Sequence, residues 1–313
     1  MYPDVKFRQI RAFIAVAEWR SFTKASAALH ISQPALTASI RQLEETLATR
    51  LLDRNTRSVT LTESGESFFA TAKYLVRSFD SFIGDTRDKG NLQAGQVVVS
   101  ALPSVSATLV RDSIPKFRRM FPGVSLHLYD GIDLDVAGHV VRMQADFGVG
   151  GRLTRYPELD FEPLAVEKAF VVFRRGHWLA QRKKVAVAEL ADEPMIVQSR
   201  RTRWQQLVEE AFVKSDVRTN TLCEVQQLSS LKSFIETGLG VAIVNSTCLP
   251  VVVGAGILAR EVASPPITRE IGIITRAGGS MSVAAESFRQ IIHAALTHAG
   301  AGPAQSADAA RPA

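Results

Sequence analysis

Apolar residues near the start of the chain recur at intervals of three and four, the spacing of one face of a helix. The segment 6–19 shows this spacing and predicts a first helix. Ser21 can cap a second helix over 22–29, and Ser32 can cap a third, in whose first turn Pro34 loses no hydrogen bond. Two helices joined by a short turn predict a helix-turn-helix, although a small helical bundle would show the same periodicity.

The third predicted helix has one apolar and one polar face. The apolar stripe, expected to face the first helix, consists of Ile31, Leu36, Ile40, Leu43 and Leu47. The outward face carries Gln33, Thr37, Ala38 and Arg41. A helix that turns polar side chains outward in this way is suited to enter a DNA groove.

The next segment predicts a β-hairpin with a basic tip. Two β-prone stretches, 51–53 and 58–61, can pair, and the tip between them carries Arg54 and Arg57. Arginines in this place can hold phosphates or enter the minor groove. Residues 1–60 contain nine Lys or Arg and five Asp or Glu, so they carry +4 of the formal net charge of +6.

A long helix is expected over 62–88, with Thr62 as its cap. Its apolar positions are separated by four, three, four and three residues, the a/d seam of a coiled coil: Phe68, Ala72, Leu75, Phe79 and Phe82. The seam predicts a dimerisation helix, although it could also pack against its own domain. The segment 90–95 is expected to end this helix and to form a hinge.

The remainder of the chain alternates strands with helices, which predicts an α/β fold with parallel-type sheets. The expected strands are 96–101, 124–129, 146–150, 161–173, 195–198, 222–225, 241–244 and 271–274. The expected helices are 104–121, 133–143, 204–214 and 228–237. Glycines, Asn245 and Pro250 interrupt the apolar stretch 238–258, which favours strand, loop and short helix over a membrane span.

Composition excludes general disorder and several kinds of chemistry. The length of 313 residues predicts two or three domains, and the pI near 9.5 suits a nucleic-acid partner without requiring one. Cys223 and Cys248 have no metal-type or CxxC spacing, and no secretion signal is visible, so a reducing cytoplasm is expected. We find no hydrolase, zinc-protease or nucleotide-binding motif, and therefore expect no catalytic residue, metal or cofactor.

The order FxxxAExxSFTKAxxxLHxSQPALTxxIxxLE, followed by LLDRNTRSVTLTESG, strongly resembles the winged helix-turn-helix of LysR-type transcriptional regulators. Ala38 and Ser39 stand where many members carry a basic or amide residue, so base reading at Ala38 is reduced to contact with a thymine methyl. The resemblance and the outward face together give an expected DNA-contact set of Ser32, Gln33, Pro34, Thr37, Ala38, Arg41, Arg54 and Arg57.

The resemblance also implies a domain organisation. It consists of an all-α-type winged helix-turn-helix over 1–62, a linker and dimerisation helix over 63–90, and an effector-binding domain over 91–300. That domain would resemble two-lobed periplasmic binding proteins, with one lobe from about 95–164 and 266–300, and the other from about 165–265. The tail 301–313 has a composition typical of disorder.

An effector site is expected between the lobes. Ser104 lies at a strand-to-helix junction, where a helix N-terminus can bind a carboxylate, or where Ser104 merely caps the helix. The arginines after Gln198, beginning with Arg200, can attract an anion or form a solvated basic loop. The resemblance adds contacts at the junction and the hinge, namely Ser104, Val105, Ser106, Tyr129, Gly148, Val149 and Gln226.

The sequence therefore predicts a sequence-specific transcriptional regulator rather than an enzyme, controlled by a small carboxylate or other anion. The implied partners are double-stranded operator DNA, further copies of the chain in a homodimer and homotetramer, and RNA polymerase, without a membrane. The competing interpretation is a solute-binding protein or enzyme whose N-terminal helices serve only in assembly. A DNA gel shift that weakens with salt separates the two.

Overall fold

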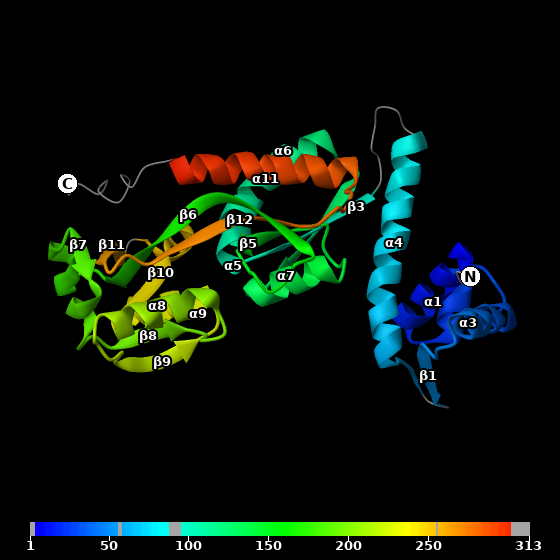
Figure 1. Cartoon of the computed structure of the whole chain (residues 1–313), viewed down its shortest axis with the longest axis horizontal. Coiled ribbons are helices and arrows are strands. Elements are labelled where there is room, and N and C mark those ends of the chain that lie inside the picture. The colour runs from blue at the N-terminus through cyan, green and yellow to red at the C-terminus, as the bar shows by residue number, and fades with distance from the viewer. Residues whose placement is uncertain (1–3, 56–57, 88–94, 255, 302–313) are drawn as a thin grey trace.

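The structure is a computed structural model that describes residues 4–55, 58–87, 95–254 and 256–301. It has three parts: an N-terminal helical domain with a small hairpin, a single long helix, and an α/β part with two lobes (Figure 1). The residues 90–94 of the expected hinge and 302–313 of the expected tail lie outside the described residues. No helix within the described ranges is long and apolar enough to cross a membrane.

The N-terminal domain contains α1 (Phe7–Trp19), α2 (Phe22–Ala28) and α3 (Gln33–Leu47), which confirms the three predicted helices. Ser21 and Ser32 cap α2 and α3, since their hydroxyls accept the backbone N–H groups of Lys24 and Ala35. The core between the helices includes Phe13, Leu36, Ile40 and Leu43, each fully buried. Apolar spacing and caps together thus determine this domain.

The prediction that Ile31 belongs to the buried stripe is wrong, because this side chain is 42% exposed. Ile31 precedes the cap of α3 and lies in the turn, so the helical periodicity does not apply to it. The predicted hairpin is present as β1 (Leu52–Asn55) and β2 (Ser58–Leu61), which pair antiparallel.

The long helix α4 (Glu63–Arg87) confirms the predicted span to within a residue or two. Thr62 caps it, because its hydroxyl accepts the N–H of Gly65 at 2.9 Å. Its first half packs on α1, where the ring of Phe13 lies 5.3 Å from that of Phe68. Leu75 and Phe79 are 47% and 46% exposed, and the ring of Phe79 also lies 4.6 Å from that of Phe7 on α1, so the predicted seam is divided between its own domain and a partly free surface.

The first lobe is built on β3 (Gly95–Ala101), which pairs in parallel with β4 (Val124–Asp130) and β5 (Phe147–Gly151). Its helical segments are α5 (Pro103–Val105), η1 (Ser106–Val110), α6 (Arg111–Met120), α7 (Asp133–Val141) and α11 (Val283–Ala301). The first three run on without a break and form the helix predicted over 104–121. The sequence analysis did not predict α11, which covers the lobe through Phe288 and Ile292.

Two long strands, β6 (Leu159–Arg174) and β12 (Thr268–Arg276), run from one lobe to the other (Figure 1). They pair antiparallel, and β12 is also antiparallel to β5. The expectation of parallel-type sheets therefore holds for β3 with its neighbours but fails for β6 and β12, whose strand pairings are antiparallel. The reason is topological: the chain leaves the first lobe along β6 and returns beside it, without a crossover helix.

The second lobe lies between these two strands in the sequence. Its strands are β7 (Lys184–Ala186), β8 (Met195–Gln198), β9 (Thr221–Val225), β10 (Ala242–Asn245) and β11 (Ile257–Ser264). Its helical segments are η2 (Trp178–Gln181), η3 (Val187–Leu190), α8 (Arg203–Lys214), α9 (Leu228–Thr237), η4 (Ser246–Cys248) and α10 (Leu249–Val252). The interrupted stretch 238–258 thus forms strand, turn and short helix, as predicted.

Candidate functional site

The outward face of α3 presents most of the residues expected to contact DNA. Those that are exposed are Ser32, Gln33, Pro34, Ala38 and Arg41, and Thr37 is half-buried. The prediction that Arg54 lies at the tip of the hairpin is wrong, because β1 extends to Asn55 and includes Arg54, while Arg57 lies outside the described residues. The structure thus brings the α3 residues together on one surface beside the hairpin.

Three of these side chains are already oriented by the protein. The hydroxyl of Thr23 on α2 donates to Oε1 of Gln33 at 3.3 Å, and the Thr37 hydroxyl donates to the Gln33 carbonyl at 3.0 Å. Nε of Arg41 lies 2.8 Å from Oε1 of Glu45, in a pair with both side chains more than half exposed. Exposed pairs contribute little stability, so Arg41 can exchange this carboxylate for a phosphate.

A cavity of about 350 Å³ lies between the two lobes. It opens at the carboxyl ends of β3, β4, β8, β9 and β10, where ligands of open α/β sheets bind. Its lining consists of Leu102, Pro103, Ser104, Asp130, Ile132, Asp133, Gln198, Thr202, Trp204, Gln226, Gln227, Leu228, Asn245, Cys248 and Arg269.

Several helices begin at this cavity. Pro103 and Asp133 are the first residues of α5 and α7, Thr202 caps α8, and Leu228 is the first residue of α9. Helix N-termini carry partial positive charge and unpaired backbone N–H groups. The cavity therefore combines partial positive charge from these helices and hydroxyl and amide side chains with the carboxylates of Asp130 and Asp133.

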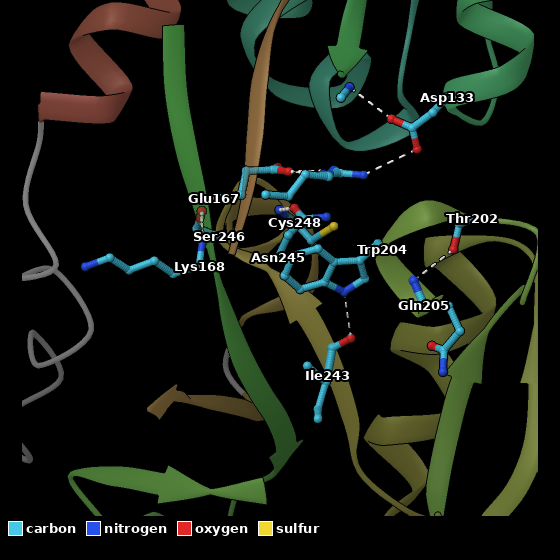
Figure 2. Close-up of polar contacts among 12 residues, drawn as sticks. Asp133, Glu167, Lys168, Thr202, Trp204, Gln205, Ile243, Asn245, Ser246 and Cys248 are labelled. Carbon is cyan, nitrogen blue, oxygen red and sulfur yellow. Dashed lines mark hydrogen bonds and ion pairs between the residues drawn. The ribbon is translucent and has the colours of Figure 1, made fainter. Parts of the chain in front are cut away.

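A buried ionic cluster forms one wall of the cavity (Figure 2). Nε of Arg269 donates to Oε2 of Glu167 at 2.8 Å, and its Nη1 lies 3.5 Å from Oδ2 of Asp133. Oδ1 of Asp133 accepts the N–H of Gly151 at 2.9 Å. Burial opposes the charge of Arg269, but Glu167 and Asp133 outweigh it and raise the pKa of the guanidinium.

This cluster joins elements of both lobes. Asp133 begins α7 in the first lobe, Glu167 and Arg269 lie on the strands that cross between the lobes, and the guanidinium lies 5.6 Å from the Trp204 ring of the second lobe. Two carboxylates face one guanidinium, so the cluster has a formal charge of −1. Arg269 is therefore already compensated before any anion enters.

Cys248 also lines the cavity, and its chemistry is determined by burial. Burial, with a further contribution from the Glu167 carboxylate, raises the pKa of its thiol to about 12. Since the thiolate is the reactive form, this thiol is a poor nucleophile at neutral pH. Among the described residues, no group of three or more His, Cys, Asp or Glu could hold a metal ion.

Three of the predicted effector residues, Ser104, Gln198 and Gln226, line the cavity. Nε2 of Gln198 is buried and has no hydrogen-bond partner within the described chain. The Gln198 side chain lines the cavity, but this nitrogen has almost no accessible surface, so a ligand would reach it only after the side chain rotates.

The other predicted effector residues lie elsewhere. Val105 and Val149 are fully buried in the core of the first lobe, and Ser106 is buried behind the cavity wall. Tyr129 stacks on His139 with ring centroids 4.6 Å apart. Arg200 is 61% exposed and pairs with Glu209 at 2.9 Å. Side chains alternate between the two faces of a strand, and each position in the first turn of a helix points in a different direction. The sequence motif alone does not show which of these side chains point toward the cavity.

Four further cavity residues were not predicted from the sequence: Asp133, Thr202, Trp204 and Arg269. The first two could have been found, because each lies at the predicted start of a helix that follows a strand. Trp204 and Arg269 gave no such signal. Arg269 and Asp133 lie more than a hundred positions apart, and only the antiparallel return of β12 brings them together.

A helix-turn-helix domain joined by a long helix to a two-lobed domain with an interlobe cavity defines the class of ligand-responsive DNA-binding regulators. Two family models match the chain. Residues 7–66 match the bacterial regulatory helix-turn-helix protein of the lysR family, and residues 90–297 match the LysR substrate binding domain. The chain belongs to the LysR family of DNA-binding transcriptional regulators.

Relatives extend over nearly the whole chain. The uncharacterised HTH-type transcriptional regulator YbhD of Escherichia coli is 30% identical over 279 residues, covering 89% of this chain and 88% of YbhD. The HTH-type transcriptional activator CmpR of Synechocystis is 24% identical, covering 93% of this chain and 96% of CmpR. Neither name is that of an enzyme.

Solved structures share the fold. A full-length OxyR variant from Pseudomonas aeruginosa has a TM-score of 0.72 at 20% identity, covering 93% of this chain and 94% of that protein. Full-length CbnR in complex with its target DNA has a TM-score of 0.65 at 19% identity, covering 93% and 99%. Identities this low establish the architecture alone, so the roles of individual residues depend on the geometry described above.

Proposed function

We propose that this LysR-family regulator is controlled by a small carboxylate-bearing effector that binds in the cavity between its lobes. One observation carries the proposal: helix N-termini converge on a cavity that hydroxyl and amide side chains also line. Such a site offers backbone N–H groups, hydroxyls and an amide donor to an anion.

The charge distribution restricts how the effector lies. Asp130 and Asp133 line one side of the cavity, while Ser104, Gln198 and Thr202 supply hydroxyl and amide groups from other elements. A carboxylate of the effector is expected to face these donors and to avoid the two aspartates. The apolar part of the effector then packs against Leu102, Trp204 and neighbouring apolar side chains.

At the DNA end, we propose that the exposed α3 face contacts an operator through Ser32, Gln33, Pro34, Thr37, Ala38 and Arg41. Arg54 and Arg57 are proposed to hold the flanking DNA. The structure of CbnR, which shares this fold and was solved with its target DNA, supports the proposal that this fold binds DNA. Because Ala38 offers only a methyl group, Gln33 and Arg41 are expected to carry most of the base and phosphate recognition.

The domain limits and assembly are part of the same proposal. Residues 1–62 would bind DNA, 63–90 would join two copies, and 91–300 would bind the effector, with lobes that divide near 165 and 266. Leu75 and Phe79 leave an apolar surface on α4 for a second copy. We further propose a homodimer, a homotetramer, a contact with RNA polymerase and a cytoplasmic location, all of which family membership supports.

Thermal shift measurements test the effector site. The full chain is heated with a panel of small carboxylates, and with the carboxamide of each as a neutral counterpart. At a ligand concentration near a hundred times Kd, binding stabilises a protein by about 2.7 kcal/mol, which raises Tm by several degrees. We expect one or more carboxylates to give this shift and the matching carboxamides to give a much smaller one.

Three variants locate the binding site. Ser104→Ala and Gln198→Ala are expected to abolish most of the shift, because each removes a donor from the cavity wall. Arg200→Ala is the control, because that side chain pairs with Glu209 on the surface. A shift that survives both cavity substitutions but disappears in Arg200→Ala would refute the proposed site and would favour the basic loop instead.

A further inference from the structure

Glu44 on α3 makes contacts that its neighbours on the helix do not. Its carboxylate Oε1 accepts the backbone N–H of Leu51 at 2.9 Å and that of Leu52 at 3.1 Å. Its carbonyl accepts the N–H of Thr49 at 3.1 Å, at the point where Ala48 turns the chain out of the helix with a φ of 49°. One residue of α3 therefore holds the beginning of β1 by its side chain and the connecting turn by its backbone.

The start of α4 holds the same segment from the other side. Thr62 donates its hydroxyl to the Arg50 carbonyl at 2.8 Å and its N–H to the Leu51 carbonyl at 3.1 Å. A Cβ at Gly65 would lie 2.0 Å from the Leu51 oxygen, so only glycine permits this approach. The segment 50–52 is thus fixed between α3 and α4.

The hairpin needs such anchors. Its strands β1 and β2 have four residues each and pair only with each other within the described chain. An isolated two-stranded hairpin is marginally stable in water, so its direction depends on what holds its base. Hydrogen bonds from N–H groups to a carboxylate are about twice as strong as neutral ones, which makes Glu44 a strong anchor.

We propose that Glu44 is a positioning residue for DNA binding. By holding Leu51 and Leu52, it fixes the hairpin of β1 and β2 relative to α3, so that both engage DNA at the same time. Its own carboxylate is turned toward the protein and would contact no base or phosphate. This inference rests on the proposed DNA contacts of α3 and of the hairpin.

Glu45 supplies a matched control. It follows Glu44 on the same helix and carries the same charge, but it pairs with Arg41 on the exposed face. Glu44→Ala and Glu45→Ala therefore change net charge equally, and only the first removes the two N–H acceptors. Glu44→Gln separates charge from geometry, because a carboxamide oxygen can accept the same two N–H groups.

The experiment is a footprint of the full chain on a DNA fragment that the wild type binds specifically. Hydroxyl radicals report the flanking backbone near the hairpin, and methylation of guanine N7 reports the major groove at α3. For Glu44→Ala we expect lost flank protection, retained major-groove protection at saturating protein, and an affinity lower by about tenfold. Glu44→Gln should regain flank protection, and Glu45→Ala should keep it.

Several results would overturn the inference. Wild-type flank protection in Glu44→Ala would show that the hairpin needs no such anchor, and a Glu44→Gln variant as defective as Glu44→Ala would show that charge alone acts. If Glu44→Ala does not fold, Glu44→Asp replaces it, since the shorter side chain withdraws the oxygen. Loss of flank protection in Glu44→Asp but not in Glu44→Gln supports the role, and the reverse contradicts it.

The proposed function has a separate point of failure in the same experiment. A wild type that protects the major groove but not the flanks would refute the hairpin contact with DNA itself, and Glu44 would then have nothing to position. A wild type that protects both, with a Glu44→Ala variant that does so too, would refute only the role of Glu44.

Discussion

Arg269 is a buried charged side chain at the centre of an ionic cluster in the two-lobed domain. It lies on a strand that crosses between the lobes, is 8% exposed, and contacts Glu167, Asp133 and the Trp204 ring. Charges buried to this extent are tolerated only when they are paired and hydrogen-bonded. The cluster therefore specifies how the two lobes meet more than it adds to their stability.

Removing Arg269 tests that account. Arg269→Ala leaves two buried carboxylates without a counter-ion, which is expected to lower the free energy of unfolding by about 3–5 kcal/mol. Unpaired burial raises a carboxylate pKa, so the loss should be larger in mildly alkaline buffer than in mildly acidic buffer, where protonation removes the charge. Denaturant unfolding at the two pH values measures both effects.

The control for Arg269 is another arginine of the same domain. Arg200→Ala removes an exposed pair with Glu209 and should change stability by no more than about 1 kcal/mol. An equal loss of unfolding free energy in the two variants would contradict the claim that Arg269 neutralises buried carboxylates.

At the same scale, local chemistry was predictable and distant chemistry was not. Ser32 and Pro34 predict the start of α3, because a cap and a proline without an N–H act within the first turn of a helix. The role of Arg269 could not be predicted from its neighbours in the sequence, since its partners lie on α7 and β6. The motif indicated Ser104, which lines the cavity, yet it could not show that Val105 turns into the core.

Among the elements, α4 has two roles along one helix. Toward its start it packs on α1, through Phe68 against Phe13 and through Lys73, whose Nζ lies 2.7 Å from the Glu18 carboxylate. Farther along, Leu75 and Phe79 are about half exposed. An apolar surface on a helix with heptad spacing is best covered by the same helix of a second chain.

Charge on this surface should separate the copies. Leu75→Asp places a carboxylate where we expect an apolar contact between copies, so sedimentation should show at least about a tenfold weaker dimer. Phe79→Asp should weaken the dimer as well, and it also removes the contact with Phe7 on α1. Ser67→Asp is the control, because it adds the same charge at an exposed position in the first half of α4. A dimer that survives both apolar substitutions unchanged would place the interface elsewhere.

Helices and strands were predicted correctly where apolar periodicity and capping residues coincide. The prediction failed for strands whose presence or direction depends on pairing with a distant strand. β8 and α9 were found at their observed limits, and α4 to within a residue or two. The short strand β7 and the strand β11 were missed, and β12 was expected to be parallel. Strand direction depends on the route of the chain between lobes, and no local pattern encodes that route.

In the whole molecule, α4 contacts both the DNA-binding domain and the first lobe. The hydroxyl of Tyr74 on α4 donates to the backbone carbonyl of Ser280 at 3.4 Å. Ser280 belongs to the first lobe and lies in the loop that follows β12. β12 in turn carries Arg269 at the cavity. Within one chain, the DNA-binding domain, α4, β12 and the effector cavity thus form a continuous series of contacting elements.

The central claim is that the exposed face of α3 reads operator DNA. Fluorescence anisotropy with DNA from upstream of the gene and its neighbours tests it most directly, with salt varied and with Arg41→Ala, Gln33→Ala and Arg200→Ala compared. Specific binding should weaken linearly in log affinity against log salt, and Arg41→Ala should reduce the slope by about one.

Gln33→Ala should instead reduce the preference for specific DNA over non-specific DNA, by about 1–3 kcal/mol. Arg200→Ala, far from α3 in the second lobe, should match the wild type in both slope and preference. Specific binding with all three variants indistinguishable from the wild type, or no salt-dependent binding by the folded protein, would contradict the account.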